Sequence, residues 1–315
     1  MKALLSHSNP ARRDEEGSSL IVVFWLLAIL SLAVITSIQL VSSDVDLIVS
    51  QKKSFRADQL CEMGLAIAVN PQTKRYDQIL TRFDPVANEG YQVRIRGEGG
   101  RLNINTILQN QDRELLARIF YWWGIEQEVG EELTDALIDW VDQDDEEGLL
   151  GAEIDWYTEN GFPINYPFNR PFYDIDEMAL VRGMEVVDQA KPNWRDYFTL
   201  YSSGQLDLRE ASQEMLEMVA EASETAALNF IEKRWGPDLI DGSEDDLQFG
   251  SLEEALSMLD VSPDDAKIAP RLTIGDSTVR IESTGKIGDY QKQVVLILQS
   301  RDSNPVILSR EERYF

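Results

Sequence analysis

Acidic side chains dominate one stretch of this sequence, and they are the first groups whose type and density could support chemistry. Between Arg118 and Arg170 there are fourteen acidic residues and no lysine or arginine, and the densest part is Asp139–Trp156. So many carboxylates repel one another unless solvent or a cation neutralises them. The stretch is therefore either a cation site or a solvated acidic loop.

The spacing of these acids suits calcium in part. Asp142, Asp144 and Glu146 occupy relative positions 1, 3 and 5 of a loop in which Glu153 takes position 12. Acids at alternate positions supply the oxygen ligands of Ca²⁺, which takes about six to eight of them. Gly148 falls at position 7, whereas an EF-hand loop has its glycine at position 6. The spacing alone leaves both the calcium site and the solvated loop open.

The sequence gives little support for a catalytic site. Two carboxylates could hydrolyse a glycosidic bond if one had a raised pKa, which no sequence pattern shows here. The one histidine, His7, precedes the apolar segment described below, so the rest of the chain has no histidine-based dyad or zinc site. No P-loop, G-x-S-x-G or G-x-G-x-x-G motif is present. We therefore expect no enzyme, no catalytic residue and no organic cofactor. We expect packing roles for the aromatic residues Trp122, Trp123, Trp140, Trp156 and Tyr157.

Composition limits the partners. The chain has 315 residues and a net charge of −27, from 56 acids and 29 bases. A nucleic-acid-binding protein needs a basic face, which this balance argues against. With a single cysteine, Cys61, no intramolecular disulfide can form.

An uncharged apolar segment near the N-terminus is long enough to attach the chain to a membrane. Leu20–Val41 spans 22 residues without a charge. At about 1.5 Å per residue, it matches a hydrocarbon core about 30 Å thick. We predict a transmembrane helix that is retained, with a buried core helix as the alternative. Lys2, Arg12 and Arg13 precede it, so the N-terminus is expected in the cytoplasm and the bulk of the chain outside.

The remaining pattern predicts an α+β protein. Helical periodicity continues from the apolar segment to Asn70, giving one helix of about 50 residues, or two helices with a kink near Ser42-Ser43. Residues 91–96 alternate as a strand, and with the glycine-rich turn and residues 101–105 they are expected to form a hairpin. Residues 106–270 are helical in pattern, and strand signals return in 271–299. This order predicts a sheet domain with an all-helical insertion between two strands.

Several motifs in this sequence are specific enough to indicate a family. Gly17 directly before an apolar helix resembles a prepilin-peptidase site, with Ser18 as the new N-terminus. The fifth residue after that site, where most pilin-like proteins have glutamate, is Val22. Four further motifs are Arg101–Thr106, Leu137–Glu146, Gly151–Tyr157 and Phe172–Met184. In their order and in the missing glutamate, these motifs resemble the K-type minor pseudopilins of type II secretion systems.

The resemblance implies a pilin-like fold, with a long N-terminal helix packed on an antiparallel sheet and a large helical insertion. It also implies a calcium site whose ligands are Asp142, Asp144, Glu153 and Asp155. The implied organisation is a prepilin leader (1–17), a transmembrane and pilin helix (18–70), the first part of the sheet domain (71–105), a helical insertion (106–270) and C-terminal strands (271–315).

The implied function is structural. The resemblance predicts a processed and methylated inner-membrane protein with a periplasmic domain, which caps the tip of the type II secretion pseudopilus and helps to start its assembly. Expected partners are the I- and J-type minor pseudopilins, the major pseudopilin, the prepilin peptidase, the inner-membrane assembly platform and secreted cargo. The alternatives are a minor pilin of a type IV pilus-like system and a single-pass membrane-anchored ligand-binding protein.

Overall fold

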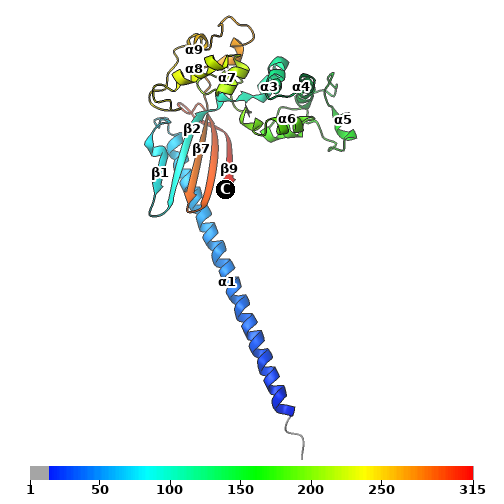
Figure 1. Cartoon of the computed structure of the whole chain (residues 1–315), viewed down its shortest axis with the longest axis vertical. Helices are drawn as coiled ribbons and strands as arrows, with labels where there is room; N and C mark the ends of the chain where they lie inside the picture. Colours follow the sequence, from blue (N-terminus) through cyan, green and yellow to red (C-terminus); the bar gives the residue numbers. More distant parts are fainter. Residues whose placement is uncertain (1–13, 315) are drawn as a thin grey trace, which may run out of the picture. The chain divides into compact units, whose positions relative to one another are not determined.

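The computed structural model describes residues 14–314, which divide into two compact units at Ala57/Asp58. The long helix α1 (Asp14–Val69) begins in the first unit and runs without interruption, as the single-helix prediction requires (Figure 1). Its apolar side chains are exposed along Leu20–Val41. Within the described residues, Leu20–Val69 is the one helix long and apolar enough to cross a membrane, judged by length and composition. His7 lies outside the described residues, and of Gly17 and Ser18 only the helical backbone is described.

The second unit is built around a five-stranded antiparallel sheet with the order β1-β2-β7-β8-β9. Its strands are β1 (Thr81–Asp84), β2 (Glu89–Gly97), β7 (Thr278–Ile287), β8 (Tyr290–Gln299) and β9 (Val306–Tyr314). The mixed fold of a long N-terminal helix, an antiparallel sheet and further helices is therefore confirmed. The short helical turn η1 (Gln78–Leu80) precedes β1.

The last turns of α1 pack on one face of this sheet. Buried residues of the helix and of the sheet form one apolar cluster, which includes Leu60, Leu65, Val93, Ile281, Val294 and Leu296. The approach is close at Gly64, where an added Cβ would lie 2.4 Å from the Ser283 Oγ and 2.7 Å from the Val93 Cγ2. Glycine is therefore required at this point because the sheet leaves no room for a side chain.

We expect Gly64→Ala to destabilise the second unit, although alanine is the better helix former. Overpacking of a tight core costs about 1–3 kcal/mol, whereas replacing a helical glycine by alanine returns about 1 kcal/mol. Urea unfolding of the two proteins measures the difference. Gly130→Ala is the matched control, because there an added Cβ would lie 3.4 Å from its nearest neighbour. A Gly64→Ala protein as stable as the Gly130→Ala protein would contradict the close packing.

The C-terminal strand β9 is tied to the sheet and to α1 by charge. The buried ammonium of Lys292 in β8 lies 2.7 Å from the carboxylate of Glu312 in β9, and it also pairs with Asp58 of α1. Arg310 of β9 adds a second bond to Glu312, at 3.0 Å. The hydrogen bonds from Lys292 and Arg310 hold the pKa of Glu312 at about 2, below its usual value.

This lowered pKa predicts an acid-sensitive contribution of Glu312 to stability. The contribution is complete above the ordinary glutamate pKa of about 4.5 and is lost as the pH falls through about 2, because the folded state then takes up a proton that the unfolded state already holds. In urea unfolding from pH 7 to pH 2, the wild type should exceed Glu312→Gln in stability at neutral pH. The two should converge at the acid end, and a gap independent of pH would contradict the pairing.

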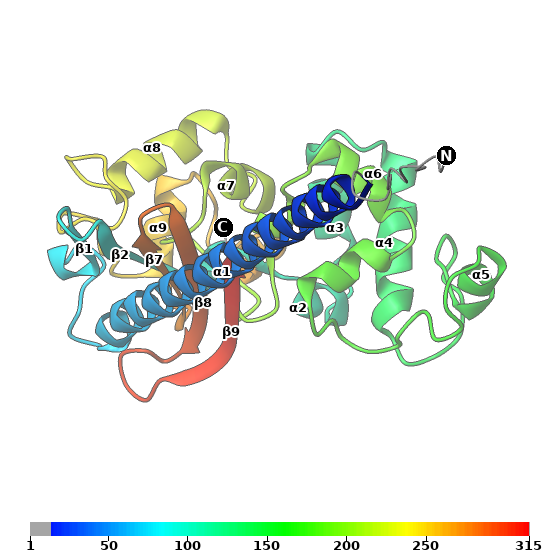
Figure 2. The same ribbon diagram turned by 90° about the horizontal axis from the view of Figure 1, so that it is seen from below.

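The chain leaves the sheet after β2 and returns at β7, and the segment between them forms the insertion. Its α-helices are α2 (Ile104–Gln109), α3 (Arg113–Trp122), α4 (Gln127–Val141), α5 (Ile154–Glu159), α6 (Met184–Ala190), α7 (Gln213–Val219), α8 (Glu224–Arg234) and α9 (Leu252–Met258). Polar caps start several of them, such as Asp112 for α3 and Ser223 for α8. Figures 1 and 2 show α7–α9 on one side of the insertion and α3–α6 on the other, with α5 at the far end.

The sequence analysis expected an all-helical insertion, whereas the structure also contains short strands there. Short helical turns join its helices: η2 (Glu98–Gly100), η3 (Ile175–Leu180), η4 (Trp194–Asp196) and η5 (Ala269–Arg271). Two pairs of two-residue parallel strands brace it, β3 (Leu102–Asn103) with β4 (Phe198–Thr199) and β5 (Leu206–Asp207) with β6 (Leu272–Thr273). One apolar cluster nevertheless runs through the whole insertion and includes Trp140, Trp194, Phe198 and Phe230.

The predicted hairpin of residues 91–96 and 101–105 is wrong. β2 pairs with β1 and β7, and Leu102–Asn103 pairs with β4 instead. The intervening glycines serve close packing: an added Cβ on Gly99 would lie 2.6 Å from the Asp276 Cβ, and one on Gly100 would lie 2.6 Å from the Glu210 carbonyl oxygen. The predicted domain boundaries stay a prediction.

Candidate functional site

The acidic loop lies between two helices of the insertion. α4 ends at Val141 with Asp142 as its C-cap, and α5 starts at Ile154 with Glu153 as its N-cap. α4 is amphipathic and buries Leu133, Leu137 and Trp140, so the loop starts from a fixed point. The loop and the packing below it therefore position the carboxylates that the sequence analysis singled out.

Two carboxylates of α4 fold the loop back onto the helix. Asp139, which is 3% exposed, accepts a hydrogen bond from the Gly148 backbone N–H at 3.0 Å. Asp135 accepts one from the Leu150 N–H at 3.2 Å and pairs with Arg113. Asp139 also leaves no room for a side chain at Gly151, where an added Cβ would lie 1.8 Å from its Oδ2. The sequence analysis assigned no role to Asp135 or Asp139, although they recur at i, i+4 on the buried face of the helix.

Two of the four predicted ligands are withdrawn from solvent: Glu153 is buried and Asp142 is half-buried. Glu153 is 3% exposed, and within the described residues neither of its carboxylate oxygens has a hydrogen-bond partner. The same holds for the Oδ1 atom of Asp142. Burial, with the nearby charges of Asp139, Asp142 and Asp145, raises the pKa of Glu153 to about 7. Burial, with Asp144 and Asp139, raises the pKa of Asp142 to about 6.

The other two predicted ligands are exposed. The Oδ1 atom of Asp144 accepts a hydrogen bond from the Glu146 N–H at 3.0 Å, which turns the chain at this point. Asp155 lies in the first turn of α5. Among residues 14–314, no hydrogen bond or ion pair joins Asp155 to the other three predicted ligands. Asp139, Asp142 and Asp145 are thus near enough to Glu153 to raise its pKa, whereas Asp155 lies at the surface.

Asn169 approaches the same loop from a distant part of the sequence. Its Nδ2 donates to the Asp144 carbonyl at 3.0 Å and to the Asp145 carboxylate at 3.1 Å. Its Oδ1 is buried and has no hydrogen-bond partner among the described residues. The backbone of Asn169 has a φ of 49°, a left-handed conformation that asparagine tolerates. No local signal in the sequence marked Asn169, because its contacts cross 24 and 25 positions of the chain.

Aromatic side chains form the floor beneath the loop. Trp140 contacts Tyr157, Tyr166 and Phe168 edge to face, with ring centroids 5.1–5.4 Å apart. The Tyr157 hydroxyl accepts a hydrogen bond from the Arg182 N–H at 3.1 Å. This confirms the expected packing role for Trp140 and Tyr157. Trp122, which is 45% exposed, does not share it.

The loop and Asn169 therefore contribute buried oxygen atoms, on Glu153, Asp142 and Asn169, that accept no hydrogen bond from the described residues. Buried acceptors without a partner cost about 1–3 kcal/mol each, and like charges add to this. Carboxylate and amide oxygens are the ligands of hard cations such as Ca²⁺. In the described part of the chain, however, no three or more His, Cys, Asp or Glu side chains stand close enough together to hold a metal ion. The donor set fits calcium in its chemistry, and binding would require these side chains to converge.

Comparison with known proteins places this loop in a defined segment. Residues 100–192 match the family model described as "Type II secretion system (T2SS), protein K". A 104-residue segment is 33% identical to the type II secretion system protein K of Pseudomonas aeruginosa and covers 30% of this chain and 30% of that relative. The predicted resemblance to the K family is confirmed for this segment.

The fold extends the likeness to most of the chain. A chain in the crystal structure of the GspK-GspI-GspJ complex from the enterotoxigenic Escherichia coli type 2 secretion system superposes with a TM-score of 0.64. The match covers 86% of this chain and 99% of that chain, at 14% sequence identity. At that identity the similarity establishes the fold alone.

Proposed function

We propose that this chain is a K-type minor pseudopilin, which caps the tip of a type II secretion pseudopilus and helps to start its assembly. The observation that carries the proposal is the large insertion between β2 and β7 of a pilin-like sheet, together with the sequence match of residues 100–192. The chain is then not an enzyme. Its partners are I- and J-type minor pseudopilins, the kind of assembly named for the similar structure.

The apolar helix supplies the mechanism of assembly. In a pilin-like filament, the amine of a newly processed subunit is thought to pair with a glutamate near the start of a neighbouring helix. An unpaired charge in lipid is costly, so this pairing favours ordered addition. Val22 offers no carboxylate to a subunit above it. The chain can therefore occupy the top position and cannot receive a further subunit in the same way.

The membrane setting follows from the same helix. The prepilin peptidase would cut after Gly17 and leave a methylated Ser18 in the inner membrane. The sheet and the insertion would then lie in the periplasm, where the insertion surface is available to secreted cargo. The major pseudopilin and the inner-membrane assembly platform would join the complex later.

The processed N-terminus tests this proposal directly. The full chain, purified from the membranes of a host with a type II secretion system, is expected to begin at N-methylated Ser18 by intact mass and peptide sequencing. It should co-purify with pilin-like companions after cross-linking. An intact Met1 in a protein that is never cross-linked to such companions would favour a membrane-anchored ligand-binding protein instead.

Position in the filament provides a second test. Val22→Glu would restore a carboxylate, and we expect the variant to enter the shaft or to impair assembly. Val23→Glu is the matched control, because it adds the same charge one position along the helix. Site-specific cross-linking to the major pseudopilin reports the position. Retention of the Val22→Glu protein at the tip alone would contradict the role of this residue.

We also propose that the acidic loop binds Ca²⁺ through Asp142 and Glu153, with Asp144, Asp155, Asp139, Asp145 and Asn169 as further candidates. Support comes from the buried oxygens that lack donors and from the raised pKa values of Asp142 and Glu153. A bound cation would neutralise the carboxylates and hold the loop between α4 and α5.

A further inference from the structure

A second polar site lies away from the acidic loop, in a cleft between the sheet and the insertion. Its volume is about 670 Å³. The walls come from the segment after α1 (73–76), the end of β2 (95–97), the start of β7 (278–279) and the segment after β8 (300–303). The insertion adds Arg234 and the segments 207–210, 243–248 and 276–277. Clefts that bind small molecules usually measure about 300–1,000 Å³. The cleft is therefore large enough for an organic ligand and not only for a single ion.

Basic side chains are frequent in this cleft, where they equal the six lining acids in number although the whole protein is strongly acidic. Six of the 29 lysines and arginines line the cleft, in a chain with a net charge of −27. They are Lys74, Arg75, Arg96, Arg209, Arg234 and Arg301.

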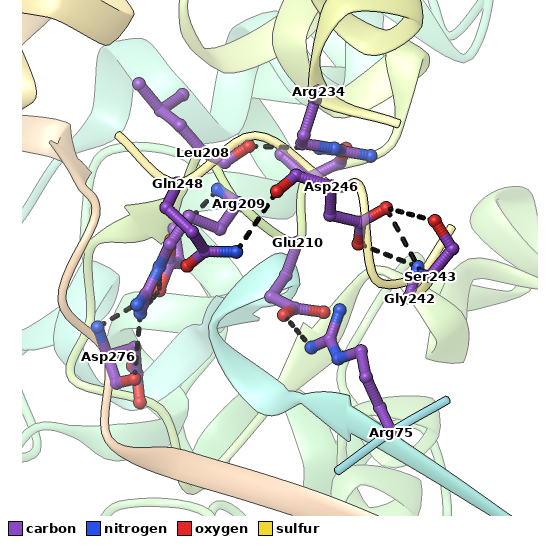
Figure 3. A network of polar contacts seen from close by, with 12 residues as sticks. Arg75, Leu208, Arg209, Glu210, Arg234, Gly242, Ser243, Asp246, Gln248 and Asp276 are labelled. Atoms are coloured by element: carbon purple, nitrogen blue, oxygen red, sulfur yellow. Dashed lines mark hydrogen bonds and ion pairs between the residues drawn. The ribbon is translucent and has the colours of Figure 1, made fainter. Parts of the chain in front are cut away.

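Four of the six acids of the cleft, one buried and three half-buried, already accept hydrogen bonds or ion pairs from the protein itself, and Figure 3 shows those of Glu210 and Asp246. Asp207, which is 1% exposed, receives the guanidinium of Arg209 at 2.5–3.2 Å. Asp276 accepts from the backbone N–H groups of Ser203 and Thr278, both at 2.7 Å. Two more carboxylates are engaged in the same way: Glu210 pairs with Arg75, and Asp246 accepts from the backbone of Gly242 and Ser243. The remaining lining acids, Glu244 and Asp302, are exposed at the surface.

Three basic side chains of the cleft have N–H donors for which the described residues supply no acceptor. Lys74 and Arg96 have exposed side chains, for which no hydrogen bond or ion pair is found among residues 14–314. Arg234 is 6% exposed, and its Nη1 donates to the carbonyls of Leu208 and Ala211 at 3.0 and 2.7 Å. The Nε–H of Arg234 is buried without an acceptor in the described structure. A buried donor without a partner is rare and needs an explanation, which a bound acceptor would supply.

We propose that this cleft binds a ligand bearing an oxyanion, either a carboxylate or a phosphate group. Guanidinium groups are matched to both, because their planar N–H fork donates two parallel bonds to such groups. Arg96 and Lys74 supply the charge at the mouth, and Arg234 supplies a buried donor. The site is separate from the loop between α4 and α5, and it does not depend on the role proposed for this chain in secretion.

Binding of simple anions to the full chain in detergent tests this site. Inorganic phosphate and succinate are the probes, each titrated against sodium chloride at equal ionic strength and followed by thermal shift and calorimetry without added calcium. We expect saturable binding of at least one of them. The probe that binds more tightly then shows whether the cleft prefers a phosphate group or a carboxylate.

Matched variants locate the binding. Arg96→Gln and Lys74→Gln are each expected to weaken binding about tenfold, as the loss of one charge-assisted hydrogen bond predicts. Arg94→Gln is the control: Arg94 is exposed on the same strand, two residues from Arg96, and does not line the cleft. All three changes are at exposed positions, so folding should persist, which unchanged melting without anion verifies. Absence of saturable binding by either probe, or equal losses in Arg94→Gln and Arg96→Gln, would overturn the proposal.

Discussion

Adding Ca²⁺ to the metal-free protein is expected to raise its melting temperature by about 5–10 °C. A ligand at about one hundred times its Kd stabilises the folded state by about 2.7 kcal/mol. For a domain of about 150–250 residues, each kcal/mol corresponds to about 2–4 °C. The gain arises because the cation supplies a partner to the Glu153 and Asp142 oxygens that otherwise have none. Thermal unfolding in metal-free buffer, with and without millimolar calcium, measures it.

Variants separate the ligands from the other acids of the loop. Glu153→Gln should remove most of the calcium shift and make the metal-free protein more stable, because it keeps the shape of the side chain and removes a buried charge. Glu159→Gln, at the exposed end of α5, should change neither value. Between the two aspartates, Asp142→Asn should reduce the shift more than Asp155→Asn. A wild type with no shift at any calcium concentration would remove the metal site.

Replacing Glu98 by alanine is expected to cost about 3–5 kcal/mol, the loss typical of breaking a buried ion pair on one side. Glu98 is fully buried, in the turn η2 where the chain leaves the sheet. It accepts two bonds from Arg280 of β7, at 2.7 and 3.0 Å, and one from the Thr199 hydroxyl of β4 at 2.5 Å. One carboxylate therefore joins the sheet to the insertion, and its loss leaves the largely buried Arg280 guanidinium without its ion-pair partner.

Urea unfolding of Glu98→Ala measures this cost, which is a large part of the total stability of about 5–15 kcal/mol that most proteins have. The double variant Glu98→Ala/Arg280→Ala should lose less than the sum of the two single changes, because the stranded charge is gone. Glu114→Ala is the exposed comparison: its partner Lys267 is on the surface, so its loss should have little effect. Equal costs for Glu98→Ala and Glu114→Ala would contradict the bracing role of Glu98.

Local patterns in the sequence were sufficient to predict the helices and the acidic stretch, which depend on residues close together in the chain. Helical periodicity predicted an N-terminal helix of about 50 residues, and it predicted helices within residues 106–270, where α2–α9 lie. The acidic stretch was found for the same reason, since the density of carboxylates is visible without a fold. These features depend on residues a few positions apart, which the order of side chains alone determines.

Contacts between distant segments were decided only by the tertiary structure. The glycines after β2 resemble a hairpin turn in the sequence, but the structure needs glycine there because Asp207, Glu210 and Asp276 pack against Gly99 and Gly100. β2 pairs with β7 across about 180–200 positions, a register that no local rule supplies. Burial likewise divided the predicted ligands, placing Glu153 inside beside Asp139 and leaving Asp155 in solvent. Which carboxylate loses water depends on how α4, α5 and the chain near Asn169 fold around it, and the sequence of the loop does not contain that information.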